Sequence, residues 1–361
     1  MERFGILPFF AVAMAFHTAP AFAAEPVPVE GDYIVPEFHF DSGETQKDLR
    51  LHYITYGNPA RDAAGHVTNA VMILHGTGGS GQQFTQAKFA GVLFGPGQLL
   101  DASRYYIILP DGIGHGKSSK PSDGPRMKFS HYDYRDMVTA QHLLLTEGLK
   151  VDHLRLVMGT SMGCMQSFMW AETWPDFMDA AMPLACLTVE IAGRNRIWRK
   201  MSMNDIRNDP AWDNGNYKQE PRGLASAEQI LLLMGSSPLQ MQTDYPTREK
   251  ADADLEAWMK ERLPKVDAND LLYALDASRD YNPSAKLGGI KAPLMWVNSA
   301  DDMINPPELG IAQEEVKKIP RGKFVLLPIT PDTRGHGTHT LPAIWKGYLA
   351  ELLAQSGGGK P

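Results

Sequence analysis

A single Gly-x-Ser-x-Gly sequence constrains the fold of this chain more than any other feature. An apolar run at 154–158 leads into residues 159–163, Gly-Thr-Ser-Met-Gly, and an apolar segment of helical length follows until Pro175. A buried strand, this pattern and a helix together form the context of a nucleophile elbow, which exposes a serine hydroxyl at the top of a sheet. A turn without chemistry is the alternative, but the pattern occurs once and in the right context. The sequence therefore predicts that Ser161 is a nucleophile.

Apolar runs typical of buried strands alternate with segments of helical periodicity. The expected strands lie at 49–56, 70–74, 105–109, 154–158, 180–187, 294–297 and 324–327, and the expected helices at 133–149, 308–318 and 341–353. This alternation predicts an α/β fold with a mostly parallel central sheet and helices on both faces. Residues 190–285 are helical in composition and rich in Met and Trp. We expect them to form a helical cap over the carboxyl ends of the strands, between a first core part (24–189) and a second (286–361).

The N-terminal segment has the features of a secretory signal peptide. Residues 4–16 are apolar but too few to span a bilayer as a mature helix, and Ala21-Phe22-Ala23 matches a small-x-small cleavage site. We expect cleavage after Ala23 or Ala24, so that residues 1–23 are the signal peptide. An uncut membrane anchor is the alternative. The expected location is periplasmic or secreted, with no membrane contact after cleavage.

Charge and cysteine content exclude several classes of partner and cofactor. The net charge is −7 and no basic block stands out, so nucleic acid is not an expected partner. The two cysteines, Cys164 and Cys186, both fall in apolar segments and lack metal-type spacing. An exported compartment would permit a disulfide, but we expect two buried free thiols. We find no ligand pattern for a metal and no phosphate-cradling loop, and we expect no cofactor.

A serine nucleophile needs an acid and a histidine base, and both have candidates in loops that follow late strands. After the strand at 294–298, Asp302 begins an Asp-x-x-x-Pro sequence and is favoured over the adjacent Asp301. After the last strand, His336 is flanked by glycines that let the loop carry its ring toward the nucleophile. His339 is the competing base, but its position favours the start of the last helix. The predicted triad is completed by Asp302 and His336.

Two backbone N–H groups are expected to form an oxyanion hole. One belongs to the residue after the nucleophile, Met162, and the other to Thr77 in the loop after the strand at 70–74. His75, in the same loop, is interpreted as a structural hydrogen-bonding histidine. The Gly-rich loop at 111–118 is interpreted as structural too, with substrate contact as the alternative.

These motifs together resemble the α/β-hydrolase superfamily and, more narrowly, its homoserine O-acetyltransferase branch. The resemblance covers nearly the whole chain after the signal peptide and is carried by residues 42–45, 95–97, 101, 104–105, 161–166, 209–212, 215, 217, 223–225, 267–269, 280 and 305–308. It implies Ser161, Asp302 and His336 as the triad. It also implies that the cap can form a homodimer contact.

The chain departs from the branch at two substrate-binding positions. In the acetyltransferases an aspartate typically follows the catalytic histidine, and here Gly337 stands there. They also carry an arginine a few residues before the Asp-Pro of the cap, where this chain has Met203 and Asn204. A bidentate carboxylate clamp requires arginine. The nearby arginines that could compensate are Arg194, Arg196 and Arg199.

The sequence therefore favours an exported serine hydrolase that cleaves a carboxylic ester or a related acyl bond of a small-molecule substrate. The alternative is an O-acyltransferase that uses the same triad, because the two activities differ only in what attacks the acyl-enzyme. Outside the cell, water is always available as the acceptor, whereas acetyl-CoA and homoserine are scarce. A binding protein with a hydrolase-like fold is the third hypothesis, and the complete Ser-Asp-His set argues against it.

Overall fold

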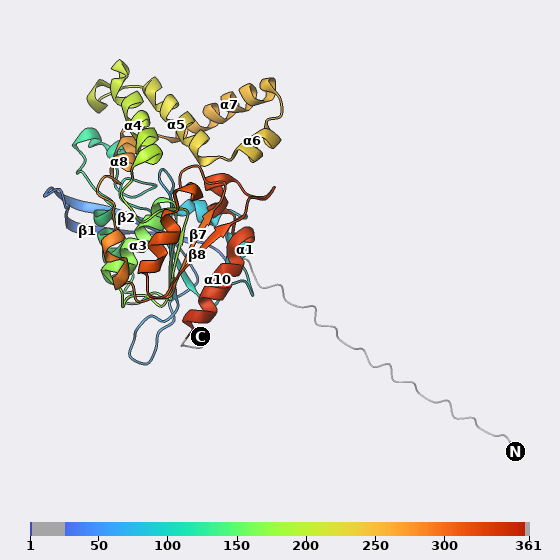
Figure 1. Cartoon of the computed structure of the whole chain (residues 1–361). Helices are drawn as coiled ribbons and strands as arrows, with labels where there is room; N and C mark the ends of the chain where they lie inside the picture. The colour runs from blue at the N-terminus through green and yellow to red at the C-terminus, as the bar shows by residue number, and fades with distance from the viewer. Residues whose placement is uncertain (2–25, 358–361) are drawn as a thin grey trace.

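The computed structural model of the chain describes Met1 and residues 26–357 (Figure 1). The predicted signal peptide, residues 1–23, lies outside the described residues apart from Met1, so its cleavage stays a prediction. Within the described part of the chain, no helix combines the length and the apolar character that a bilayer crossing needs.

One eight-stranded sheet organises the molecule, in the order β1-β2-β4-β3-β5-β6-β7-β8. Its strands are β1 (Val29–His39), β2 (Thr45–Tyr56), β3 (Ala70–Leu74), β4 (Tyr106–Pro110), β5 (Leu156–Thr160), β6 (Ala181–Leu184), β7 (Leu294–Ser299) and β8 (Gly322–Leu327). The β1–β2 and β2–β4 pairs are antiparallel, and all other neighbours are parallel. Every residue of β3, β4 and β5 is buried, as expected for parallel strands covered on both faces.

Alternate residues of the central strands pack into two separate cores, one on each face of the sheet. In β3, Met72 and Leu74 point into one core, whereas Val71 and Ile73 point into the other. The first core also holds side chains of α2 (Tyr134–Leu143) and α3 (Met162–Thr173). The second holds side chains of α1 (Ala90–Leu93) and α10 (Pro342–Ser356). A mostly parallel sheet with helices on both faces confirms the predicted fold class.

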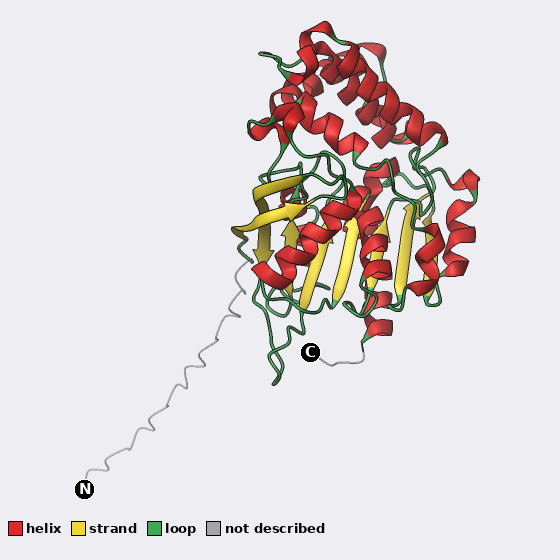
Figure 2. Ribbon diagram, turned by 90° about the vertical axis from the view of Figure 1, so that its left-hand side faces the viewer, coloured by secondary structure: helices red, strands yellow, loops and turns green. Residues whose placement is uncertain are grey.

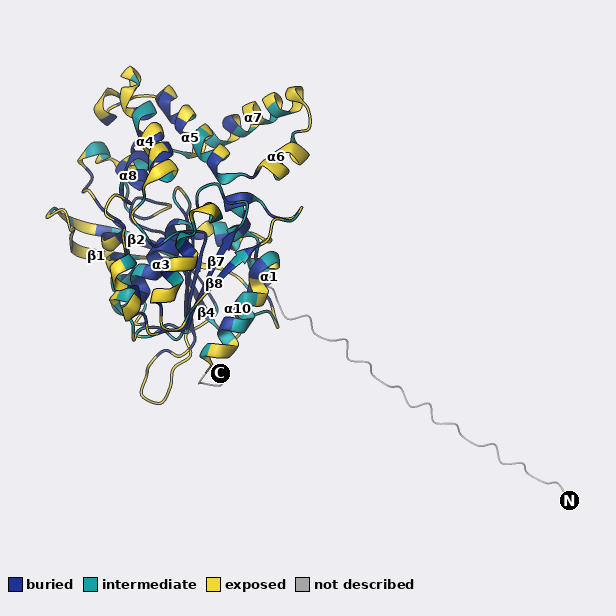
Figure 3. Ribbon diagram, viewed as in Figure 1, coloured by how far each residue is buried: buried dark blue, intermediate teal, exposed yellow. Residues whose placement is uncertain are grey.

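A helical cap is inserted between β6 and β7 and lies above the sheet in Figure 2. Its helices are α4 (Gly193–Asn208), α5 (Arg222–Gly235), α6 (Pro238–Asp244), α7 (Arg248–Arg262) and α8 (Ala268–Asp276). The cap has its own apolar core, built largely from α4, α5 and α8. Helices α6 and α7 are mostly exposed in Figure 3, and Met259 is the buried residue of α7.

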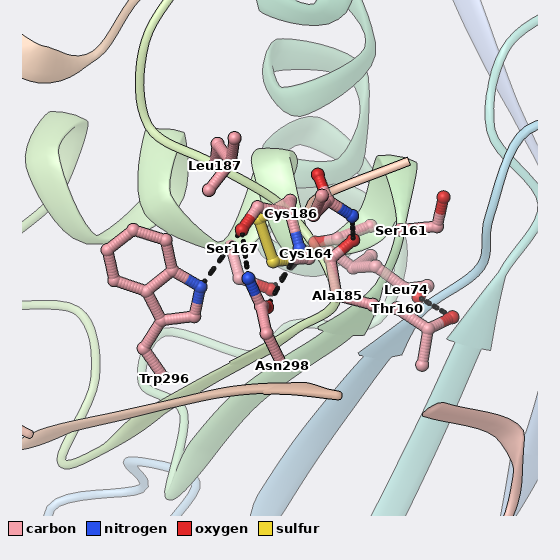
Figure 4. Close-up of a disulfide and its surroundings, with 12 residues drawn as sticks. Leu74, Thr160, Ser161, Cys164, Ser167, Ala185, Cys186, Leu187, Trp296 and Asn298 are labelled. Carbon is pink, nitrogen blue, oxygen red and sulfur yellow. Dashed lines mark hydrogen bonds between the residues drawn. A yellow bond between two sulfur atoms is a disulfide. The ribbon is translucent and has the colours of Figure 1, made fainter. Parts of the chain in front are cut away.

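Cys164 and Cys186 form a disulfide, so the expectation of two free thiols is wrong (Figure 4). Cys164 lies in the first turn of α3, just after β5, and Cys186 follows the end of β6. Because β5 and β6 are neighbours in the sheet, the two Cα atoms come within 5.8 Å, a separation that a disulfide spans. The apolar sequence around each cysteine indicated burial correctly, but the proximity arises from strand order.

The segment that carries Cys186 is also held by β7. Trp296 and Asn298 donate side-chain hydrogen bonds of 3.1 and 3.0 Å to the Cys186 carbonyl oxygen. The Cys186 N–H donates to the Asn298 side-chain oxygen at 3.2 Å. The disulfide therefore connects the start of α3 to a segment that is itself fixed to the sheet.

Candidate active site

Ser161 occupies a strained turn between β5 and α3. Its φ and ψ angles are 56° and −111°, in a region that residues with side chains seldom adopt. A Cβ atom at Gly159 would lie 2.1 Å from the Gly163 carbonyl oxygen, and one at Gly163 would lie 2.1 Å from that of Leu74. Both glycines of the Gly-x-Ser-x-Gly sequence are therefore required, because strand and helix leave no room for side chains.

The structure brings Ser161, His336 and Asp302 into one chain of hydrogen bonds. His336 Nε2 lies 2.8 Å from Ser161 Oγ, and His336 Nδ1 lies 2.8 Å from Asp302 Oδ2. Asp302 follows β7 and His336 lies in the loop after β8, as their sequence positions predicted. Both side chains are buried. The arrangement allows the imidazole to take the serine proton while the carboxylate holds the ring and stabilises its charged form.

Asp302 is held in its charged form by its neighbours. Burial would raise the pKa of this carboxyl, but the His336 charge and hydrogen bonds from His336, Asn305 and Ile304 lower it below its ordinary value. Asn305 Nδ2 donates at 2.9 Å to Asp302 Oδ2 and at 3.1 Å to the Ala185 carbonyl oxygen. Sequence reasoning gave Asn305 no role, because the turn capped by Asp302 requires only the backbone N–H of residue 305, which donates to Asp302 Oδ1 at 3.2 Å.

The two competing candidates have other contacts. Asp301 accepts a hydrogen bond of 3.0 Å from the Gly335 N–H, so it supports the histidine loop rather than the ring. His339 is buried, with its ring centroid 5.0 Å from that of His336. Burial, and then the charge of His336, lower the pKa of His339 to about 3, which keeps this second imidazole neutral.

The predicted oxyanion-hole residues lie beside the nucleophile. Met162 is the first residue of α3, and Thr77 lines the same cavity as Ser161 and His336. The neighbouring His75 has its Nδ1 2.9 Å from the Gly76 carbonyl oxygen, and its Nε2 accepts from the Gly112 N–H at 2.9 Å. These contacts agree with a structural role for this histidine.

The loop at 111–118 is organised by the buried side chain of Asp111. This carboxylate accepts backbone hydrogen bonds from Gly81 at 2.7 Å and from Lys117 at 2.8 Å. His52 Nδ1 lies 2.9 Å from the same carboxylate. These contacts fit the structural interpretation of the loop.

A cavity of about 320 Å³ opens on Ser161 between the sheet and the cap. Its apolar lining includes Trp198, Leu231, Leu232, Met234, Trp258 and Ile304. Its charged lining consists of Arg199, Glu228 and Arg262. Arg262 forms two hydrogen bonds with the buried Glu228 carboxylate, at 2.7 and 3.3 Å. Sequence reasoning missed this ion pair, because the direction of a cap side chain depends on helix packing.

The resemblance places an arginine of the acetyltransferases at Met203 or Asn204 of this chain, and Met203 is buried in the apolar core of the cap. Gly337 follows His336 and adds no side chain to the site. At the two places where the resemblance implies an arginine and an aspartate, this chain therefore has no charged side chain.

Comparison with known proteins agrees with the fold and the motifs. A family model described as alpha/beta hydrolase fold matches residues 69–330. A homoserine O-acetyltransferase of Pelobacter propionicus is 30% identical over 338 residues, covering 83% of this chain and 89% of that protein. The solved acetyl esterase MekB is 27% identical, with a TM-score of 0.76 over 90% of this chain and 97% of its own.

A solved homoserine O-acetyltransferase from Bacillus anthracis has a TM-score of 0.79 over 91% of this chain and 98% of its own, at 19% identity. At that identity the likeness shows the fold alone. The Pelobacter relative covers most of the chain, and the family model includes the stretches that carry Ser161 and Asp302. The protein thus belongs to the α/β-hydrolase family, in its homoserine O-acetyltransferase-like branch.

Proposed function

We propose that the protein transfers an acyl group from an ester to an alcohol by way of an acyl-serine intermediate. The observation that carries this proposal is the continuous Ser161–His336–Asp302 contact, with 2.8 Å at each step. Ser161 Oγ attacks the ester carbonyl carbon as its proton passes to His336 Nε2. The N–H groups of Thr77 and Met162 stabilise the oxyanion, and the leaving alcohol takes the proton from His336.

The relatives support an alcohol as the acceptor. This enzyme of the α/β-hydrolase class has acyltransferase and esterase relatives, and the first curated matches are a probable acyltransferase and several homoserine O-acetyltransferases. They favour the acyltransferase alternative over the hydrolase preferred in the sequence analysis. In the second half-reaction His336 would deprotonate the acceptor hydroxyl, which then attacks the acyl-enzyme.

Water is the second candidate acceptor, and two observations favour it. The solved relative at 27% identity is an acetyl esterase. Met203, Asn204 and Gly337 are uncharged, whereas the resemblance implies charged groups suited to an amino-acid acceptor at these positions. Hydrolysis uses the same triad, with His336 activating water instead of an alcohol.

The products formed from the acyl-enzyme show whether an alcohol or water is the acceptor. The protein is given p-nitrophenyl acetate with homoserine, glycerol or no added alcohol, and the products are identified by mass spectrometry. Faster p-nitrophenol release with an O-acetylated alcohol as product supports the transferase. Release that ignores the alcohol and yields only acetate supports the hydrolase. No turnover, with Ser161 unlabelled by a fluorophosphonate, contradicts both.

We further propose that the enzyme is exported and dimerises through its cap. The signal-peptide pattern supports export, and N-terminal sequencing of protein from a fractionated culture tests it. The exposed apolar side chains of Leu233, Leu239 and Leu255, on helices α5, α6 and α7, support a second copy as the partner of the cap. Light scattering of the wild type and of Leu239→Asp tests it, and a monomeric wild type contradicts it.

A further inference from the structure

A second cavity, lined mainly by polar residues, adjoins the cavity at Ser161. This polar cavity measures about 770 Å³, against about 320 Å³ for the cavity that contains the nucleophile. Its walls come from the loop after β3, the Gly-rich loop at 111–118 and the part of the cap that runs from α7 into α8. A volume of this size is typical of a site for a small molecule.

Two features connect the polar cavity with the nucleophile. The loop after β3 packs on Ser161 at its start, where a Cβ atom at Gly76 would lie 3.2 Å from the Ser161 Cβ, and it lines the polar cavity from Gly78 onward. The ion pair of Arg262 and Glu228 lines both cavities, so it forms the boundary between them. A substrate held at Ser161 therefore reaches the polar cavity by extending past this ion pair.

Every charged side chain of the polar cavity already has a partner. The charged lining consists of three cations and three carboxylates, Lys120, Arg262, Lys265, Glu228, Asp267 and Asp270. Arg262 pairs with Glu228, and the two lysines pair with Asp123 and Glu261, at 2.9 and 2.8 Å. Asp267 accepts backbone hydrogen bonds at the start of α8, and Asp270 accepts two from Ser122. A charged ligand would meet no unpaired charge among these lining residues, so the cavity favours an uncharged one.

The uncharged polar lining suits a ligand rich in hydroxyl groups. Its side chains are Ser80, Gln82, Gln83, Gln86, His115 and Ser122. Hydroxyl and amide groups both donate and accept hydrogen bonds, as the hydroxyls of a ligand do.

His115 adds a buried acceptor that has no donor. Burial, and then the charge of His75, lower the pKa of His115 to about 3, so the ring is neutral. Its Nδ1 lies 2.9 Å from the Ile113 carbonyl oxygen, which places the proton on Nδ1 and makes Nε2 an acceptor. Among residues 26–357 this buried Nε2 has no hydrogen-bond partner. A hydroxyl group of a ligand would supply the missing donor.

We propose that the polar cavity binds the alcohol half of the substrate and that this alcohol is an uncharged polyol such as a sugar. This inference rests on the proposed acyl-transfer function and adds the chemical class of the alcohol. The cap lining of the cavity at Ser161 is largely apolar and suits the acyl group, so the half rich in hydroxyls belongs in the polar cavity. The uncharged residues Met203, Asn204 and Gly337 agree with it, because a sugar needs no charged partner.

The polyol takes part in the reaction through one of its hydroxyl oxygens. Ser161 Oγ bonds to the acyl carbon, the bond from that carbon to the polyol oxygen breaks, and this oxygen takes the proton from His336. When the polyol is the acceptor, the same steps run in reverse. The reacting oxygen lies beside His336 in both directions, while the other hydroxyls extend past the Arg262–Glu228 pair.

A matched pair of esters tests the class of the alcohol. Methyl 6-O-acetyl-α-D-glucopyranoside is compared with cyclohexylmethyl acetate. Both are acetates of a primary alcohol on a six-membered ring, and only the sugar ring carries hydroxyls. Release of the alcohol is measured, so the comparison holds whether water or another alcohol takes the acetyl group. We expect kcat/KM to favour the sugar ester by about 10-fold or more, as two net hydrogen bonds supply.

Ser80→Phe should abolish this preference by filling the polar cavity. Ser80 lines the cavity and precedes a short helix without capping it through its side chain. Ser103→Phe is the matched control: it enlarges an exposed serine before β4, at the opposite end of the parallel strands, and the preference should persist. Absence of a preference in the wild type overturns the proposal whether or not the variants fold. So does a preference that Ser80→Phe retains.

A binding measurement separates this proposal from the proposed function. Ser161→Ala protein is titrated with methyl α-D-glucopyranoside and with cyclohexylmethanol, and binding is followed by saturation-transfer NMR. Tighter binding of the sugar, lost on adding Ser80→Phe, supports the polyol site even if the wild type turns over no ester. Equal binding of both, or binding of neither, together with normal turnover of p-nitrophenyl acetate by the wild type, overturns the polyol site and leaves the acyl-transfer function intact.

Discussion

Reduction of the Cys164–Cys186 disulfide should lower the free energy of unfolding by about 3 kcal/mol. The bond closes a loop between cysteines 22 positions apart. In the chain-entropy description a loop of this length removes roughly 11 cal/mol/K from the unfolded ensemble, or about 3.4 kcal/mol at 25 °C. For about 330 ordered residues, at roughly 2.1 cal/mol/K of unfolding entropy each, this corresponds to a melting temperature lower by about 5 °C.

The assay is scanning calorimetry of the protein with and without a phosphine reductant, after thiol alkylation and mass spectrometry have established the redox state. The double variant Cys164→Ala, Cys186→Ala is the control, and its melting temperature should not respond to the reductant. Two alkylated cysteines in the untreated, denatured protein would refute the reasoning. A melting temperature that reduction leaves unchanged would refute it equally.

Three further predictions concern the triad and one buried acid. Ser161→Ala should lower kcat by about 10⁶-fold with an unchanged melting temperature, and activity near the wild-type level would exclude Ser161 as the nucleophile. Asp302→Asn should lower kcat by roughly 10⁴-fold, because the amide favours the wrong histidine tautomer, whereas a mild loss would point to Asp301. Burial raises the pKa of Glu172 to about 7. Between pH 4.5 and about 7 the Glu172 carboxyl is therefore protonated in the folded protein but ionised in the unfolded chain. The free energy of unfolding should fall as pH rises through that window, by up to about 3 kcal/mol. Urea titrations at several pH values measure this dependence. The free energy of unfolding of Glu172→Gln should depend less on pH than that of the wild type, and an identical dependence would contradict the raised pKa of Glu172.

The meeting of Ser161, Asp302 and His336 could be predicted from the sequence because each follows a strand in a short loop. Ser161 lies in a pattern whose two glycines are required by atoms only a few residues away or on the adjacent strand. Asp302 and His336 occupy loops that a parallel sheet brings to the same edge. The sequence alone could not decide whether Asp301 or Asp302 contacts the histidine, because that depends on the direction of each side chain. In the structure Asp301 accepts from the Gly335 N–H, whereas Asp302 contacts the His336 ring.

The disulfide and the charged lining of the cavity could not be predicted in the same way. The bridge depends on β5 and β6 being neighbours, a fact about strand order. Whether Arg199 faces the nucleophile or solvent depends on how α4 rotates against α5 and α8, which adjacent residues do not determine. Long-range packing, rather than local propensity, sets both features.

The position of the cap in the chain has a consequence for how such an enzyme can diversify. The proposed nucleophile, acid and base all come from segments outside the insertion between Leu184 and Leu294, whereas most side chains around the cavity at Ser161 come from within it. Both ends of the insertion attach to adjacent strands, β6 and β7. Mutations in this one continuous stretch can therefore change the substrate specificity, while the proposed catalytic residues outside it stay the same.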